Sequence, residues 1–89
     1  MTDFYYVYVL RSETTGKLYV GFTRNLKRRI QQHRMGQSDY TSRGGPWQLI
    51  YSEAYISEKD ARERERFLKS GRGREVLRRQ LSYTLIRGK

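Results

Sequence analysis

The chain has 89 residues and a formal net charge of +10, with 19 Lys and Arg against nine Asp and Glu, which predicts one strongly basic domain over residues 1–89. With no cysteine and a single histidine, His33, the sequence excludes disulfides, thiolate metal sites and His-rich zinc sites. Its apolar runs fall short of the ~20 residues that a membrane span needs, and Met1-Thr2-Asp3 does not begin a signal peptide, so we expect a soluble, cytoplasmic protein with no membrane partner.

The first half of the chain has the pattern of a β-hairpin followed by a helix. Residues 4–10 are aromatic and β-branched apart from one leucine, which is typical of a largely buried strand. A turn at Thr14-Thr15-Gly16 leads into a second strand at 17–22. Thr23 is placed to cap a helix that continues to about Met35 and stops at Gly36.

The second half returns to a strand before it becomes helical. Glycines and a proline among the polar residues 36–46 predict an exposed loop, and residues 47–55 have strand composition. Ser57 and Asp60 resemble a capping box for a helix that ends near Gly71.

A last short helix is expected at 74–81, with apolar side chains on one side at Val76, Leu77 and Leu81. The order β-β-α-β-α-α then predicts an α/β (α+β) sandwich, in which helices flank a three-stranded sheet.

Basic residues are concentrated in two stretches. Residues 24–43 hold six basic side chains and one acid, and residues 69–89 hold seven and one, whereas five of the nine acids lie between 53 and 65. Two such stretches suit a surface that follows a phosphate backbone, so we expect nucleic acid as the partner, ahead of an anionic membrane surface or an acidic protein. The expected contacts are Arg24, Lys27, Arg28, Arg43, Lys69, Arg72 and Arg74, with the loop at 36–46 and the tail at 82–89 as further candidates.

The first predicted helix places two polar residues on its apolar face. Leu26, Arg29, Ile30 and His33 follow one another at helical spacing, so Arg29 and His33 point toward the strands. An ordinary structural role remains open for each, because an arginine stem can cover a hydrophobic rim and a half-buried histidine can be satisfied by hydrogen bonds.

The second predicted helix carries a carboxylate in the same position. Glu65 lies on the stripe formed by Ala61 and Leu68, whereas Glu63 belongs to the solvated face. An inward carboxylate costs several kcal/mol unless it is paired or binds a metal. A salt bridge to an arginine and a hard cation such as Mg²⁺ are the two interpretations.

The eight tyrosines concentrate in the hairpin. Strand alternation places Tyr6 and Tyr8 on one face, and Tyr19 on the second arm can share that face with Tyr8. Tyrosines with a buried ring and a hydroxyl at the rim are common in cores, so each residue alone indicates little.

Together, these features resemble the GIY-YIG endonuclease superfamily over nearly the whole chain. Tyr6-Val7-Tyr8 and Tyr19-Val20-Gly21 match its two sequence motifs, while the segment at 69–74 and Pro46-Trp47 look like the small single-domain bacterial members, which include homologues of the N-terminal domain of an excision-repair nuclease. The resemblance implies a small α/β sandwich around a three-stranded antiparallel sheet. Tyr6 stands where the first motif has glycine, and Phe22 stands where some relatives carry a lysine.

The resemblance also implies roles for individual residues. The catalytic set would be Tyr8, Tyr19, Arg29, His33 and Glu65, with Glu65 as the ligand of Mg²⁺ or Mn²⁺ and Gly21 where the backbone needs room. The activity would be metal-dependent hydrolysis of phosphodiester bonds in DNA, in repair or recombination, on a substrate that includes branched or damaged duplex.

The residue types suit that chemistry. Arg29 offers a permanent bidentate cation to a phosphate, and a metal ion on Glu65 would act as Lewis acid and stabilise the leaving group. Tyr8 is the candidate general base, provided that nearby cations lower its pKa from ~10. Tyr19 would orient the water or the phosphate, and His33 would orient Tyr8 or share the proton transfer.

Two other functions are consistent with the same composition. One is a basic nucleic-acid-binding module that does not cleave, and the other is an adaptor domain whose basic helix contacts an acidic protein. Whether the domain cleaves on its own also stays open, and specificity is expected from a protein partner, from a homodimer or from DNA shape.

Overall fold

The computed structural model describes residues 3–35 and 44–87. Its sheet consists of β1 (Tyr5–Ser12), β2 (Leu18–Thr23) and β3 (Trp47–Tyr55), which are antiparallel in the order β2-β1-β3. The expected three-stranded antiparallel sheet is therefore confirmed, with the first strand in the centre. In the β1–β2 ladder, Tyr8 lies opposite Gly21 and Leu10 lies opposite Tyr19.

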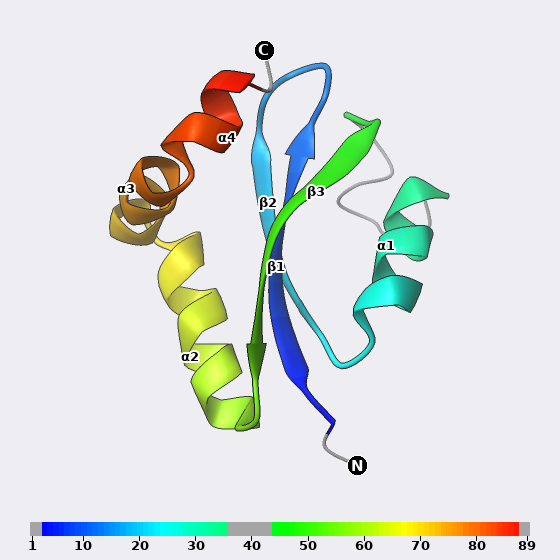
Figure 1. The fold of residues 1–89 in the computed structure, drawn as a ribbon, viewed down its shortest axis with the longest axis vertical. Coiled ribbons are helices and arrows are strands. Elements are labelled where there is room, and N and C mark those ends of the chain that lie inside the picture. Colours follow the sequence, from blue (N-terminus) through cyan, green and yellow to red (C-terminus); the bar gives the residue numbers. More distant parts are fainter. Residues whose placement is uncertain (1–2, 36–43, 88–89) are drawn as a thin grey trace.

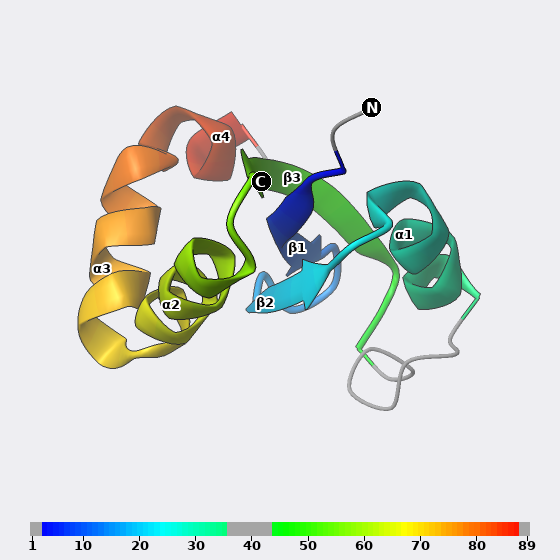
Figure 2. The ribbon, with the colours of Figure 1, turned by 90° about the horizontal axis from the view of Figure 1, so that it is seen from below.

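Helices cover both faces of this sheet, as Figures 1 and 2 show. One face carries α1 (Leu26–Arg34), and the other carries α2 (Glu58–Lys69), α3 (Gly71–Gln80) and α4 (Ser82–Arg87). The predicted α+β sandwich is thus confirmed. β2 forms an edge of the sheet, and α1 and α2 lie on either side of that edge.

Alternation along β1 divides the core into two clusters. Val7 and Val9 face α2 and α3, where they pack with Leu68 and Leu77. Each of these fully buried side chains contributes about 1.5–3 kcal/mol. The other side of β1 packs under α1, in a smaller cluster built from Tyr8, Leu10 and Trp47. The candidate catalytic tyrosine is consequently part of the smaller core.

The start of α1 differs from the sequence-based expectation. Its N-cap is Asn25, whose side-chain oxygen accepts a hydrogen bond from the backbone N–H of Arg28 at 3.1 Å. Thr23 instead accepts from the backbone N–H of Asn25 and donates to the Asn25 carbonyl, so it stabilises the turn that precedes the helix. The helix ends at Arg34, with Met35 as its C-cap.

The prediction that α3 begins near Arg74 is wrong. The Ser70 hydroxyl accepts from the backbone N–H of Gly73 and caps a helix that already begins at Gly71. Glycine is required at position 73, because a Cβ there would collide with the backbone carbonyl of Phe67 at the end of α2. Gly73 therefore permits the close packing of α2 against α3.

Two further expectations near the C-terminus change. Residues 82–87, which were expected to form a tail, form the short helix α4. On α3, Leu77 and Leu81 are buried as predicted, but Val76 is exposed. Within the described residues, no helix is both long enough and apolar enough to cross a bilayer.

A polar network that the sequence analysis did not identify joins α2 to β3. The carboxylate of Glu53 accepts hydrogen bonds from the Tyr51 and Tyr55 hydroxyls and from the Arg64 guanidinium, which binds both carboxylate oxygens at 3.1–3.2 Å. Burial alone would raise the pKa of Glu53, but these hydrogen bonds and the charge of Arg64 outweigh it and lower that pKa.

Candidate active site

Two tyrosines of the hairpin meet on the side of the sheet that α1 covers. The ring centroids of Tyr8 and Tyr19 lie 6.2 Å apart. A Cβ at Gly21 would collide with the ring and hydroxyl of Tyr8, so the missing side chain lets this phenol cross β2 toward the edge of the sheet. The expected need for space at Gly21 has a direct structural cause.

His33 of α1 completes this aromatic cluster. Its side chain is 3% exposed, and its Nε2 lies 2.8 Å from the Tyr8 hydroxyl oxygen. Its ring centroid lies 5.6 Å from that of Tyr8 and 5.3 Å from that of Tyr19. Trp47 of β3 contacts Tyr19 from the other side, with ring centroids 6.5 Å apart. His33 therefore points inward, as predicted, and its imidazole lies within hydrogen-bond distance of Tyr8, the candidate base.

Burial dominates the ionisation of both groups. It raises the pKa of Tyr8 well above 10, with further increases from Tyr19 and Glu65 and an opposing effect of the Arg29 charge. Burial, followed by the charge of Arg29, lowers the pKa of His33 below 6.5. At neutral pH the pair is therefore a neutral phenol and a neutral imidazole. The charge of Arg29 lowers the pKa of Tyr8, as expected, but burial outweighs this effect and the pKa is raised.

Arg29 and Glu65 lie on helices on opposite faces of the sheet, and both are near enough to Tyr8 for their charges to influence its pKa. Arg29 lies on α1 and Glu65 on α2, and the charge of each contributes to the pKa of Tyr8. This arrangement is compatible with the sheet between them because Tyr8 extends across the edge strand β2 at Gly21. The structure thus places four of the candidate residues around one edge of the sheet, with Tyr19 beside them.

The Glu65 carboxylate is mostly covered and already paired. Its side chain is 15% exposed, with Lys69 Nζ at 2.8 Å and Arg62 Nη1 at 3.7 Å. Its neighbours on the predicted apolar stripe, Ala61 and Leu68, are both fully buried. Glu65 therefore forms the salt bridge to an arginine that was one of its two interpretations, and Lys69 of the same helix is a closer partner.

A polar pocket of about 540 Å³ opens at this edge. We call it the arginine pocket; its lining comes from β2, α1 and α2 and consists of Phe22, Thr23, Arg24, Asn25, Arg28, Arg29, Gln32 and Arg62. None of these residues is acidic, so the pocket is suited to an anion with several oxygen atoms, such as a phosphate.

Sequence reasoning missed Arg62, which lies in the helix with the most acids. Its guanidinium carbon sits 3.7 Å from the centroid of the Phe22 ring, which is a close cation–π contact. The spacing to Glu65 at i+3 was the available indication, but the contact with Phe22 joins α2 to β2 and has no local pattern in the sequence.

A divalent cation fits Glu65 only as a site with one protein carboxylate. Among the residues that the structure describes, no group of three His, Cys, Asp or Glu side chains could hold a metal ion. Mg²⁺ accepts this situation, because it keeps several waters and takes phosphate oxygens together with one or two carboxylates. Binding would require Lys69 and Arg62 to release the carboxylate.

The other predicted nucleic-acid contacts separate into groups. Arg24 and Arg28 line the arginine pocket, Lys27 is exposed on another side of α1, and Lys69 is paired with Glu65. Arg72 is exposed on α3, away from the pocket lining, and Arg74 donates to the Leu18 carbonyl at 3.4 Å and so supports the fold. Arg43 and the loop segment 36–43 lie outside the described residues.

Known proteins share both the sequence pattern and the fold. A family model described as the GIY-YIG catalytic domain matches residues 4–77. The chain is similar to the UPF0213 protein OB0043 of Oceanobacillus iheyensis, with 36% identity over 66 residues that cover 73% of this chain and 76% of that protein. The solution NMR structure of the UPF0213 protein BH0048 from Bacillus halodurans has a TM-score of 0.53 and 35% identity, over 83% of this chain and 81% of that one.

A second kind of relative, much longer than this chain, carries a functional name. The structure-specific endonuclease subunit SLX1 homolog of Drosophila mojavensis is 50% identical over 56 residues. The match covers 53% of this chain but only 18% of that protein.

Proposed function

The chain belongs to the GIY-YIG catalytic domain family, and on this premise we propose that it is an endonuclease that hydrolyses phosphodiester bonds in DNA with the help of a divalent metal ion. The observation that carries the proposal is the convergence of Tyr8, His33, Arg29 and Glu65 around the edge of β2, next to the arginine pocket. A structural role alone does not require a phenol, an imidazole, a guanidinium and a carboxylate at one place.

The arginine pocket positions the phosphate. Arg29 and Arg62 enter it from helices on opposite faces of the sheet, so together they can contact different oxygens of one phosphodiester. Their guanidinium groups stay charged at all relevant pH values and bind phosphate oxygens through paired N–H donors. Negative charge that develops on the phosphate during hydrolysis is stabilised by the same contacts.

The hydrogen bond between Tyr8 and His33 provides a route for the proton. Because both groups are neutral, Nε2 of His33 can accept the hydrogen bond that the Tyr8 hydroxyl donates. The phenol oxygen then accepts a proton from the attacking water while the phenolic proton moves to His33. Tyr8 is the group next to the water in this scheme, and His33 is the base that finally holds the proton.

Glu65 would hold the metal ion. When bound there, Mg²⁺ or Mn²⁺ supplies Lewis-acid stabilisation of the phosphate and of the departing 3′ oxygen. Glu65 also keeps a negative charge near Tyr8, which favours the protonated phenol in the resting protein.

We place the activity in DNA repair or recombination, on branched or damaged duplexes. The printed name of the relative in Drosophila mojavensis, a structure-specific endonuclease subunit, supports this placement. Since the matched region is a small part of that relative, we propose that substrate choice here depends on DNA shape, on a protein partner or on a homodimer.

Nicking of supercoiled plasmid and of branched oligonucleotides in Mg²⁺ and Mn²⁺ tests the proposal. Arg29→Ala and Glu65→Gln should each lower the cleavage rate at least about 100-fold, the usual scale for the loss of one transition-state contact. Arg78→Ala on α3 and Glu63→Gln on α2 are matched controls, because both side chains are exposed.

Wild-type protein that cuts none of these substrates with either metal ion would refute the nuclease. If it nevertheless binds DNA with a steep salt dependence, the non-cleaving binding module becomes the better description. If Glu65→Gln and Glu63→Gln cleave DNA at the same rate, Glu65 has no role in catalysis.

A further inference from the structure

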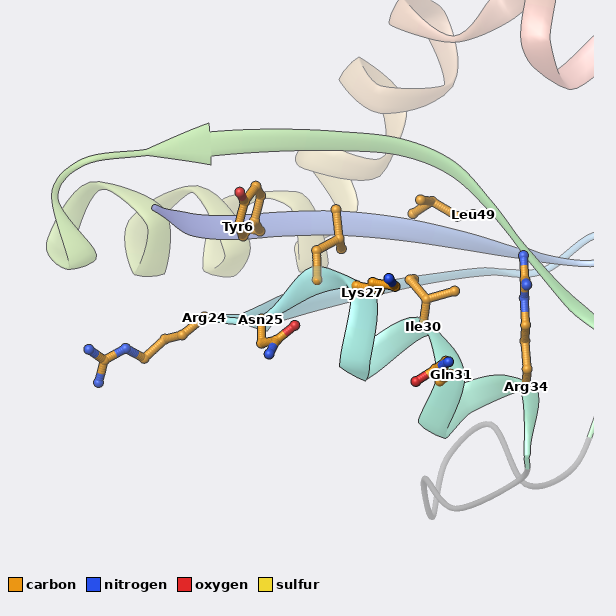
Figure 3. Close-up of a pocket in the computed structure, with 9 residues that line it drawn as sticks. Tyr6, Arg24, Asn25, Lys27, Ile30, Gln31, Arg34 and Leu49 are labelled. Atoms are coloured by element: carbon orange, nitrogen blue, oxygen red, sulfur yellow. The ribbon is translucent and has the colours of Figure 1, made fainter. Parts of the chain in front are cut away.

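A second groove, of about 610 Å³, runs along the side of α1 that faces away from the arginine pocket (Figure 3). We call it the α1 groove. Its strand residues are Tyr6 from β1 and Leu49 from β3, and its helical side consists of Leu26, Lys27, Ile30, Gln31 and Arg34, with Arg24 and Asn25 from the preceding turn. The mechanism above uses none of the side chains that form its interior.

The interior of the α1 groove is aromatic and aliphatic. Tyr6, Leu26, Ile30 and Leu49 are all half-buried, so each shows part of its apolar surface to the groove. Phe4, which is 39% exposed, extends the aromatic surface, with its ring centroid 6.4 Å from that of Tyr6. An open site with these side chains can cover a flat, apolar ring by stacking and aliphatic contact.

The rim of the groove is basic and amide-rich. Arg24 and Arg34 stand at its two ends, as Figure 3 shows, and Lys27 lies between them. Asn25 and Gln31 add donors and acceptors, and none of the lining residues is acidic. This charge distribution suits an anionic molecule with a flat apolar part, which describes a nucleotide better than it describes an apolar peptide or a neutral small molecule.

The groove and the arginine pocket share two lining residues. Arg24 and Asn25, in the turn between β2 and α1, line both of them. A nucleic-acid strand whose phosphate lies in the arginine pocket can therefore continue around the start of α1 and bring a neighbouring base to the α1 groove. A base that is stacked within a duplex cannot make this contact, because its faces are covered by its neighbours.

We propose that the α1 groove binds an unpaired nucleobase of the strand that the arginine pocket holds, with Tyr6 as the stacking platform. This inference rests on the proposed nuclease function and specifies its substrate class: DNA with at least one unpaired nucleotide next to the reacting phosphate, as in a flap or a branch. Tyr6 acts as a specificity-determining residue and not as a catalytic one, because its ring contacts the base in the α1 groove and not the reacting phosphate.

Binding measurements without a divalent metal ion test the groove separately from cleavage. The probes are a 5′-flap duplex and a blunt duplex of the same sequence, with fluorescent 2-aminopurine as the first unpaired base of the flap. Tyr6→Ala should weaken flap binding about tenfold relative to blunt-duplex binding, since a base–aromatic stack has this size. Tyr6→Phe should keep the preference, because the aromatic face remains. The 2-aminopurine fluorescence should be quenched by the wild type and by Tyr6→Phe but not by Tyr6→Ala.

Two additional variants protect the test against misfolding and non-specific effects. Lys27→Glu changes an exposed rim residue and should also lower the preference for the flap, without touching the core. Tyr83→Ala is the matched control, because this tyrosine is 83% exposed on α4, on the other face of the sheet. It should behave like the wild type with both probes.

The outcomes separate this inference from the proposed function. Wild-type protein that cleaves DNA but binds flap and blunt duplex equally, with no change in Tyr6→Ala, overturns the inference and leaves the nuclease intact. Protein that prefers the flap through Tyr6 but does not cleave refutes the nuclease alone. If Tyr6→Ala instead converts a dimer into a monomer in sedimentation and leaves the DNA preference unchanged, a second copy of the chain occupies the groove and the inference is wrong.

Discussion

The phenol of Tyr8 occupies the space that a side chain at Gly21, its partner in the β1–β2 ladder, would fill. This pairing brings the Tyr8 hydroxyl to 2.8 Å from Nε2 of His33 and across the edge strand. The glycine of the second motif therefore leaves room for the side chain of Tyr8, the candidate catalytic tyrosine. It does not require an unusual backbone angle, since the positive φ values among the described residues occur at Gly16 and Gly44.

Gly21→Ala should consequently destabilise the protein and disrupt the site together. A methyl group forced into packed space costs about 1–3 kcal/mol, and the movement of Tyr8 breaks its hydrogen bond with His33. Urea denaturation should show this loss, whereas Gly71→Ala, where no neighbouring atom lies within 4 Å, should leave stability nearly unchanged.

A double-mutant cycle identifies the contact responsible. In a Tyr8→Ala background the Gly21→Ala substitution should cost less than about 0.5 kcal/mol, because the colliding ring is gone. An undiminished cost in that background would mean that position 21 needs glycine for another reason.

The ionisation of His33 gives a second prediction. Burial and Arg29 lower its pKa below 6.5, so Arg29→Ala should raise that pKa, but not above 6.5, because burial remains. His33 is the one histidine in the sequence, so its ring protons give a unique signal for NMR titration. Arg66→Ala, an exposed arginine of α2, is the control and should leave the titration unchanged.

The lowered pKa of His33 also predicts how stability and cleavage depend on pH. Below pH 6.5 the unfolded chain binds a proton at His33 more readily than the folded protein does, so stability falls as the pH drops through the folded pKa. The cleavage rate should fall over the same range, since protonated His33 cannot accept the proton of Tyr8. A His33 signal that titrates at or above 6.5 in the wild type would contradict the neutral pair.

The sequence was sufficient for the parts of this site that depend on local periodicity. Strand alternation allowed Tyr8 and Tyr19 to share one face of the hairpin, and helical spacing directed Arg29, His33 and Glu65 inward. Local periodicity could not show that residues of α1 and α2 line one pocket at the edge of β2, because this depends on the order of the strands in the sheet.

The predictions that failed concern features that depend on contacts between residues far apart in the sequence. The last helix was expected to begin at residue 74, after Gly73, because the approach of Gly73 to the Phe67 carbonyl comes from packing between α2 and α3. The raised pKa of Tyr8 depends on the depth of its burial, which a one-dimensional charge pattern does not contain. Arg62 was passed over because its partner Phe22 lies on another element.

The Glu53 network supplies a third prediction, about stability. Glu53→Gln removes the negative charge that Arg64 binds. It also replaces one carboxylate oxygen by an NH₂ group, which cannot accept a hydrogen bond from a tyrosine hydroxyl. The free energy of unfolding should therefore fall by about 1–3 kcal/mol. The exposed Glu63→Gln is the control, with an expected change below about 0.5 kcal/mol.

The network also predicts how stability depends on acid. Since the pKa of Glu53 is lowered in the folded protein, its contribution is present above the ordinary pKa of 4.5 and is lost as the pH falls below that value. Denaturation curves between pH 3 and pH 7 should therefore be less steep in pH for Glu53→Gln than for the wild type. Parallel profiles would show that Glu53 does not titrate with a lowered pKa.

The last prediction concerns Lys69, whose Nζ holds the Glu65 carboxylate at 2.8 Å. A cation this close opposes a metal ion on the same oxygens, so Lys69→Met should tighten Mn²⁺ binding roughly tenfold in the absence of DNA. Stability should change by less than about 1 kcal/mol, because the Lys69 side chain is 48% exposed and Arg62 remains as a second partner of Glu65. Calorimetric titration with Mn²⁺ measures the affinity, with Lys59→Met, an exposed lysine of α2, as the matched control. In Glu65→Gln the binding should disappear with either lysine present. Mn²⁺ binding that survives in Glu65→Gln and ignores Lys69 would place the metal ion elsewhere, and the proposed mechanism would then lose its ligand.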